Sequence, residues 1–489
     1  MERRKVQLPA LKTQWISVEV CPVPALSISP AAIALNRFGL GARAEDARPA
    51  DPRRWLLDQF DRFEVSPAGF ASLDDAGAAF KAYREGQQAD RRLAKQNGAT
   101  DAETELKVGR QDFREDVQAL YRAGVQARAD SALTTPAPFV ERMVHFWSNH
   151  FCVSVDAPSV TAFAGAFERD AIRPHVLGRF ADMALAAEQH PAMLLYLNQA
   201  QSIGPDSVAA ARNPDRKRGL NENLAREIME LHTLGVRSGY SQADVTEFAR
   251  ALTGWTIDGI GAGAMARGNP NRFAFRQAFH EPGARTILGK RYPQDGESQA
   301  RAALLDFVQT PATATHVATK LARHFAGDDP PPSLVARLAA SFIAGKGDLP
   351  TLYSTLIASP EAWVTTSTKF KTPWEWTISS LRGIGHTQVG NMQIAALQTQ
   401  LGQRVWKPGA PAGWDDIAAS WSGSDALLRR VEIAQRLAGP VSERVDARLL
   451  APKILPESLS TSTEEQIAHS ESPAGAIALL LVSPDFLRR

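Results

Sequence analysis

Apolar residues recur at intervals of three and four positions along most of the chain after about residue 27. This spacing places them on one face of an α-helix. The stretch from Ile257 to Tyr292 breaks the pattern, because glycines are dense there and "FAFRQAFH" and "RTILGKRY" alternate weakly between apolar and polar residues. We therefore predict a mostly α fold, a large multi-helix single-domain bundle, with a small hairpin or loop excursion around residues 257–292.

Several predicted helices begin at a hydroxyl residue followed by proline. A Ser or Thr side chain can accept a hydrogen bond from a free N–H of the first turn, and proline at the first helical position removes no needed donor. The pairs that precede helical patterns are Ser29-Pro30, Thr135-Pro136, Thr310-Pro311, Ser359-Pro360, Thr372-Pro373 and Ser483-Pro484.

The organisation we predict is an irregular tail over residues 1–27 and one helical domain over residues 28–489. Residues 81–131 are rich in charge and are predicted to form a protruding helical hairpin broken near Gly98. A solvated arm is the plainest interpretation of such a segment.

Composition narrows the choice of partners. The 489 residues are 44% apolar and 22% charged, with 55 basic and 53 acidic side chains and a net charge of +2. This balance argues against duplex DNA or an anionic membrane as the main partner. The cysteines, Cys21 and Cys152, form neither a CxxC pair nor a disulfide framework.

The first residues are basic but lack the apolar core of a signal peptide, because Lys12, Gln14 and Glu19 interrupt it. The apolar run from Ala476 to Val482 is too short to cross a bilayer. We therefore expect neither an export signal nor a transmembrane segment.

The stretch "NENLAREIMELHTLGV", residues 221–236, is an amphipathic helix with two exceptions to its pattern. His232 falls within the apolar face, and Glu227 falls at its edge. A carboxylate in that position is partly buried, and its pKa shifts in consequence. Asn221 or Asn223 is predicted to cap the helix.

The stretch "PFVERMVHFWSNHFCV", residues 138–153, places His150 among large apolar residues. Two helices thus each bury one histidine, and we expect His150 and His232 to lie on neighbouring helices. With Glu227 they are candidates for acid–base catalysis. The alternative is a pair of structural histidines bonded to backbone carbonyls. A metal site has less support, since neither HExxH nor a cysteine cluster is present, and no cofactor is assigned.

The remaining candidates are weaker. His280 and Glu281 lie in a glycine-flanked loop that suits a binding or lid role, or a plain turn. The basic stretch "RNPDRKRG" could hold phosphate or sulfate, but short basic loops are usually only solvated. Tryptophans could stack on sugars, although they more often fill a core. GxSxG, P-loop and GxGxxG signatures are absent.

Taken together, "ALNRFGLGA", "FWSNHF", "HPAMLLYLN", "NENLAREIMELHTLG", "ADVTEFARALTGW", "ILGK" and "PAGW" resemble a large bacterial family of unknown function. Its genes often sit beside a sulfatase-like or alkaline-phosphatase-like family. The resemblance runs from about Ala31 to Arg489 and implies one mostly helical domain, frequently exported. The positions of this chain that match the family's motifs are Asn149, His150, Asn221, Glu222, Asn223, Arg226, Glu227, Glu230, His232, Gly254, Trp255 and Trp414. At His280-Glu281 the family usually has His-Asp.

Two function classes follow. The first is a hydrolase or lyase acting on a polymer or glycan, with Glu227, His232 and His150 as catalytic residues. Substrate contacts are then assigned to Asn149, Asn221, Glu222, Asn223, Arg226, Glu230, His280, Trp255 and Trp414. The second is a non-catalytic assembly or export partner of the sulfatase-like protein. The sequence leaves open whether the chain is an enzyme.

Overall fold

The structure is a computed structural model that describes residues 28–73, 75–81, 99–212, 219–259, 269–366, 369–390 and 392–489, with residues 99–110 as backbone only. More than half of these residues are helical, as the apolar spacing predicts. The longer helices of the first half are α2 (Pro52–Leu57), α5 (Ala99–Thr134), α6 (Pro138–His150), α7 (Pro158–Phe167), α8 (Phe180–Gln189), α9 (Pro191–Tyr196), α11 (Asn223–Glu227) and α12 (Gln242–Leu252). Those of the second half are α13 (Glu297–Val308), α14 (Pro311–Ala326), α15 (Pro332–Ala344), α16 (Leu349–Ala358), α17 (Pro373–Gly383), α18 (Ile394–Gln400), α19 (Ser424–Ala438), α20 (Ala447–Ile454), α21 (Thr461–Ala468) and α22 (Pro473–Val482).

The strands of the described part form two short antiparallel pairs. Strand β1 (Trp255–Ile257) pairs with β2 (Phe273–Phe275), and β3 (Arg285–Ile287) pairs with β4 (Lys290–Tyr292). They lie close to the residues where the sequence predicts a hairpin excursion, so this prediction is confirmed.

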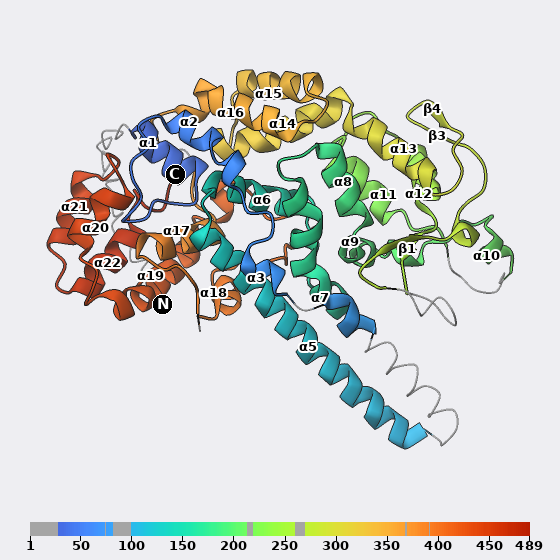
Figure 1. Cartoon of the computed structure of the whole chain (residues 1–489), viewed down its shortest axis with the longest axis horizontal. Helices are drawn as coiled ribbons and strands as arrows, with labels where there is room; N and C mark the ends of the chain where they lie inside the picture. Colours follow the sequence, from blue (N-terminus) through green and yellow to red (C-terminus); the bar gives the residue numbers. More distant parts are fainter. Residues whose placement is uncertain are drawn as a thin grey trace, which may run out of the picture.

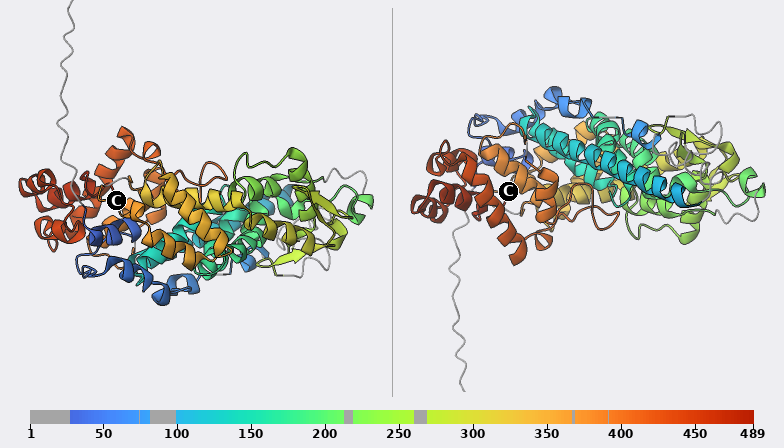
Figure 2. Two further views of the ribbon diagram at one scale, coloured as in Figure 1. Left: turned by 90° about the horizontal axis from the view of Figure 1, so that it is seen from above. Right: turned by 90° about the horizontal axis from the view of Figure 1, so that it is seen from below.

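Helices are arranged along an elongated body (Figures 1 and 2). Helices α19 to α22 lie at one end, and α8 to α13 with the hairpins lie at the other (Figure 1). Helix α5 has 36 residues and is therefore about 54 Å long. One end of α5 packs on α7 and α17, and the other extends away from the body (Figure 1). The predicted break near Gly98 lies outside the described residues, as does the predicted tail.

The hydroxyl–proline signals give mixed results. Ser29, Thr310 and Thr372 each accept a hydrogen bond from the first turn, as predicted. Thr135 does not cap a helix, because α6 begins at Pro138. The hydroxyls of Ser359 and Ser483 donate to carbonyls of the preceding helix. Such backward bonds compete with capping. A short helix does begin at Pro360, but the Ser359 side chain makes no capping bond to it. Ser483 Oγ bonds in both directions, because it also accepts a hydrogen bond from Phe486 N (3.2 Å) in the turn that follows.

The predicted helix over residues 221–236 is shorter and less regular than expected. Helix α11 ends at Glu227 and continues as one π-helical segment, η6 (Ile228–His232). Asn221 Oδ1 accepts a hydrogen bond from Asn223 N (2.9 Å), whereas the side chain of Glu222 at the N-cap makes no capping bond. Asn221 thus serves the first turn, as predicted for one of the two asparagines.

Buried apolar side chains form two clusters. The first cluster draws its residues from Ile33 to Ala362, and most of the second lies between Phe370 and Leu487. Helix α5 contributes to both. The boundary between the clusters positions the site described next.

Candidate functional site

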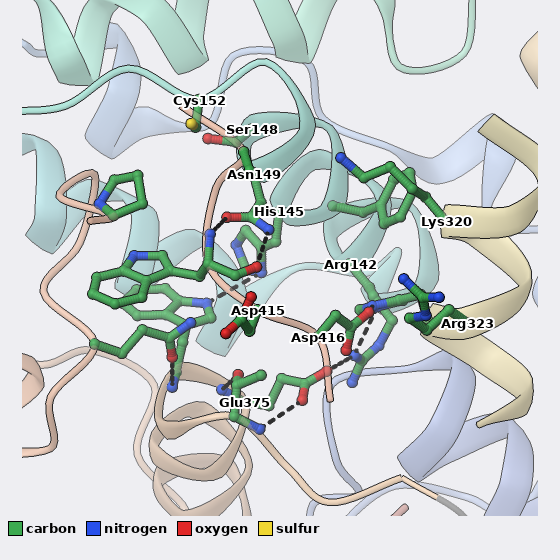
Figure 3. A pocket seen from close by; sticks show the side chains of 18 of the residues that line it. Arg142, His145, Ser148, Asn149, Cys152, Lys320, Arg323, Glu375, Asp415 and Asp416 are labelled. Atoms are coloured by element: carbon green, nitrogen blue, oxygen red, sulfur yellow. Dashed lines mark hydrogen bonds and ion pairs between the residues drawn. The ribbon is translucent and has the colours of Figure 1, made fainter. Parts of the chain in front are cut away.

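A cavity of about 400 Å³ lies where α6, α14, α17 and the segment 401–417 meet. This volume is typical of a small-molecule pocket. Side chains of both hydrophobic clusters line it, among them Phe146 from the first and Trp374 from the second. Its charged and histidine residues are Arg128, Arg142, His145, His316, Lys320, Arg323, His324, Glu375, Asp415 and Asp416, most of them labelled in Figure 3.

Helix α6 contributes Arg142, His145 and Asn149 to one wall. Their spacing of three and four residues places them on one side of the helix. Most of α6 is buried, so these polar groups need partners inside the protein. They find them in α17 and in the segment 401–417.

Asn149 fixes the segment 401–417 to α6. Its Nδ2 donates to the carbonyl oxygen of Trp414 (2.9 Å), and its Oδ1 accepts from Trp414 N (2.8 Å). Gly413 lies beside this pair of hydrogen bonds and has a φ of +85°. A Cβ at this position would come 2.8 Å from Asn149 Oδ1. A side chain is therefore excluded by both the conformation and the space.

Asp416 and His324 form a hydrogen-bonded pair at the cavity. His324 Nδ1 lies 2.7 Å from Asp416 Oδ2, and its Nε2 lies 3.4 Å from Arg142. Burial lowers the pKa of His324 below its ordinary value, so the ring is neutral near pH 7. Burial alone would raise the pKa of Asp416, but His324 and Lys369 lower it well below its usual range. The carboxylate thus orients a neutral imidazole.

Glu375 connects two guanidinium groups at the base of the cavity. It forms ion pairs with Arg142 and with Arg489 (2.8 Å). Its carboxylate also accepts from Thr372 N (2.9 Å), completing the capping box of α17. Burial would raise the pKa of Glu375, but Arg489 and Arg142 together lower it far below its usual range. Glu375 is therefore a fixed anion and a poor proton donor.

Helix α14 supplies the cationic wall. Lys320 and Arg323 project from this helix into the cavity (Figure 3). Burial lowers the pKa of Lys320 to about 8. Arg323 Nε donates to the carbonyl oxygen of Asp328 (3.1 Å).

Aromatic rings form another part of the wall. Trp374 and Trp406 line the cavity, and the guanidinium of Arg128 lies 4.9 Å and 5.6 Å from their ring centroids. Arg128 is in turn paired with Glu168 (2.8 Å). The arrangement gives a rigid surface of aromatic and planar cationic groups.

Two nucleophile types also border the cavity. Cys152 donates to the carbonyl oxygen of Pro411 (3.0 Å), and burial raises the pKa of its thiol to about 12. The thiol therefore remains protonated and unreactive near neutral pH. The buried Oγ of Ser148 has no hydrogen-bond partner among the described residues.

The histidines predicted from the sequence are buried and adjacent, as expected. His150 and His232 are each 1% exposed, with ring centroids 6.2 Å apart. His150 Nε2 donates to the carbonyl oxygen of His232 (3.1 Å), and His232 Nδ1 lies 2.7 Å from Glu188. Neither ring lines the cavity. Such contacts are typical of structural histidines.

Glu227 is half-buried, as predicted from its place at the edge of the apolar face. Burial raises the pKa of its carboxyl group. It has neither a hydrogen bond nor an ion pair with any described residue, and it does not line the cavity.

Of the predicted substrate contacts, Asn149 and Trp414 line the cavity and the others do not. Trp255 is fully buried, and His280 is buried with its Nδ1 bonded to the carbonyl oxygen of Thr253 (2.9 Å). The others belong to or flank α11 and η6; they are Asn221, Glu222, Asn223, Arg226 and Glu230. Residues 213–218, most of the basic stretch, lie outside the described residues.

The sequence interpretation missed the α14 side of the cavity. His316, Lys320 and Arg323 recur at intervals of four and three, a polar stripe on a helix whose other side is buried. That stripe was the available signal, but a solvated helix face gives the same pattern. No sequence pattern indicated that Glu375 and Asp416 line a site, because only the folding of the chain brings them next to α6 and α14.

No group of three or more His, Cys, Asp or Glu side chains is arranged to hold a metal ion within the described ranges. Within the same ranges, no helix is long and apolar enough to span a membrane.

The comparisons with known proteins give one match. Residues 33–488 match the family described as "Protein of unknown function (DUF1800)". Neither a curated protein nor a solved structure matches the chain. Because the matched region spans nearly the whole chain, this protein belongs to the DUF1800 family.

Proposed function

We propose that the chain is an enzyme of the hydrolase or lyase class, and that the cavity between α6, α14, α17 and residues 401–417 is its active site. One observation carries the proposal. A neutral His324, oriented by Asp416 at 2.7 Å, lies in a cavity of small-molecule size. This is the arrangement of a general base whose tautomer is fixed by a carboxylate.

The chemistry assigns a role to each polar group. His324 Nε2 takes a proton from a water molecule or from the substrate. Asp416 stabilises the imidazolium that forms, as Asp does in a hydrolytic triad. In the resting site the Arg142 guanidinium lies 3.4 Å from Nε2. A bound water molecule or substrate must take the place of this long contact, and the guanidinium can then face the developing negative charge of the substrate.

The walls favour a ring-bearing substrate. Trp374, Trp406 and Trp414 line the cavity, and flat apolar faces of sugars or other rings stack on tryptophan. A polymer end or a glycan unit fits this surface, in agreement with the substrate class proposed from the sequence. We now place the acid–base group at His324 rather than at Glu227.

The test is a turnover screen with chromogenic glycosides, esters, phosphate esters and sulfate esters. We expect the wild type to act on at least one class, and His324→Asn to reduce kcat by about 100-fold or more, the usual contribution of a general base. His469→Asn alters an exposed histidine on another surface and should leave kcat unchanged. Absence of turnover by the wild type, or full activity of His324→Asn, would contradict the proposal.

A further inference from the structure

Two cations of the cavity, Lys320 and Arg323, form no ion pair with any described residue. Arg142 pairs with Glu375, and Arg128 pairs with Glu168. Lys320 has neither an ion pair nor a hydrogen bond with any described residue, although it is only partly exposed. A half-buried ammonium group without a partner is unfavourable for the folded state.

Arg323 increases this unfavourable charge. It lies three positions after Lys320 on α14, and both side chains line the cavity. Arg323 Nε donates to the carbonyl oxygen of Asp328, and neither terminal nitrogen has a partner among the described residues. Like charges at this spacing repel each other. Two neighbouring cations directed into one cavity are therefore explained if an anion binds between them.

The carboxylates that line the cavity do not serve as counter-ions for Lys320 and Arg323. Glu375 is held by Arg142 and Arg489, and Asp416 is held by His324 and Lys369 (3.0 Å). Asp415 accepts from Ser420 (2.8 Å) and is exposed. None forms an ion pair with Lys320 or Arg323.

We propose that Lys320 and Arg323 bind an oxyanion group of the ligand, a carboxylate, sulfate or phosphate, inside the cavity. The inference rests on the proposed function only in taking the cavity as the ligand site. It identifies the substrate class as acidic, with a planar guanidinium and a mobile ammonium as its two contacts. These are the donors that proteins use for carboxylate and phosphate groups.

Binding of sulfate or acetate should weaken between about pH 6.5 and 9.5 as Lys320 loses its proton. Burial lowers the pKa of Lys320 to about 8, so the ammonium form is lost over this interval. The cysteine, the histidines and the carboxylate that interact with Lys320 or border it keep their charge over this interval. Burial raises the pKa of Cys152 to about 12 and lowers the pKa values of His150, His316 and His324. Asp416, whose pKa is far below its usual range, remains ionised.

Burial also lowers the pKa of Lys371, which interacts with Glu375 and Arg142, to about 7. The contribution of Lys320 is therefore the part of the pH dependence that disappears in Lys320→Met.

The experiment is isothermal titration calorimetry of the full chain with inorganic sulfate, inorganic phosphate and acetate at pH 6.5. We expect saturable binding of at least one of these anions to one site. Lys320→Met and Arg323→Met should each weaken it about tenfold or more, the effect of losing a charge-assisted hydrogen bond. The matched control is Lys453→Met, an exposed lysine on α20, which should bind as the wild type does. Which of the three anions binds most tightly identifies the oxyanion.

A second set of titrations is made at pH 9.5. The affinity of the wild type for the anion should fall about tenfold or more there, because the Lys320 ammonium group is largely deprotonated. His324→Asn should keep its affinity for the anion. Loss of turnover with intact anion binding would therefore separate the acid–base proposal from this one. Absence of saturable binding of all three anions, or unchanged binding by Lys320→Met, would overturn the inference.

Discussion

The His232–Glu188 and His324–Asp416 pairs have the same length, 2.7 Å, but lie in different surroundings. In the first pair the side chains are 1% and 0% exposed, and His232 Nε2 is buried with no hydrogen-bond partner among the described residues. In the second they are 12% and 24% exposed, and the ring borders a cavity. A histidine–carboxylate contact alone therefore does not mark a reactive site. What differs is whether the pair borders a cavity.

The largest expected effect distinguishes the two pairs by stability. His232→Leu leaves the fully buried Glu188 without its partner, and we expect the free energy of unfolding to fall by about 3–5 kcal/mol. His324→Leu should lower it by only about 1 kcal/mol, because Asp416 keeps its ion pair with Lys369. Urea denaturation of the two variants measures both values. Equal losses would remove the distinction between a sealed pair and an open one.

The next effect concerns the segment that closes the cavity. Gly413→Ala forces a Cβ against Asn149 at a positive φ, and we expect a loss of about 2–3 kcal/mol together with weaker ligand binding. Gly402→Ala is the matched control, since Gly402 has φ +84° but open space around its Cα. Thermal melts should show a clearly larger decrease for Gly413→Ala. A similar decrease in both variants would mean that backbone strain, and not the contact with Asn149, dominates.

A third effect appears in acid. The folded-state pKa of Asp416 lies well below the unfolded value, so its contribution to stability is present above about pH 4 and is lost as the pH falls below that. We expect wild-type stability to decline between pH 5 and pH 3 with a contribution of up to about 1 kcal/mol per pH unit from this group. Asp416→Asn should show a shallower slope over that interval. Chemical denaturation at each pH provides the slopes, and identical slopes would refute the assignment.

The smallest effect tests the carboxylate favoured by the sequence. Burial raises the pKa of Glu227, so its charged form is disfavoured in the folded state. Glu227→Gln removes that charge without leaving a described partner unpaired, and should raise stability at pH 7 by about 0.5–1 kcal/mol, reduced by its partial exposure. Turnover should be unaffected. An unshifted melt combined with lost turnover would return the active site to α11.

The fold follows from the sequence to a large extent. Periodic apolar residues define the helices, and the glycine-dense region around residues 257–292 contains the strands, because both patterns are local consequences of backbone geometry. The starts of helices are predicted less accurately than the helices themselves. The hydroxyls of Ser359 and Ser483 can bond either to the following turn or back to the preceding helix. The burial of His150 and His232 also followed from periodicity.

The candidate site was decided by tertiary structure. Periodicity identifies which face of a helix is polar, but it does not distinguish a face turned to solvent from one turned to an internal cavity. Arg142 and Lys320 lie on such faces of α6 and α14. Their neighbours Glu375 and Asp416 come from positions far along the chain, and no local pattern links them. The sequence by itself therefore determined the helices and the buried histidines. Only the packing of distant segments decided which histidine borders the cavity and which of its cations lack an ion pair with the described residues.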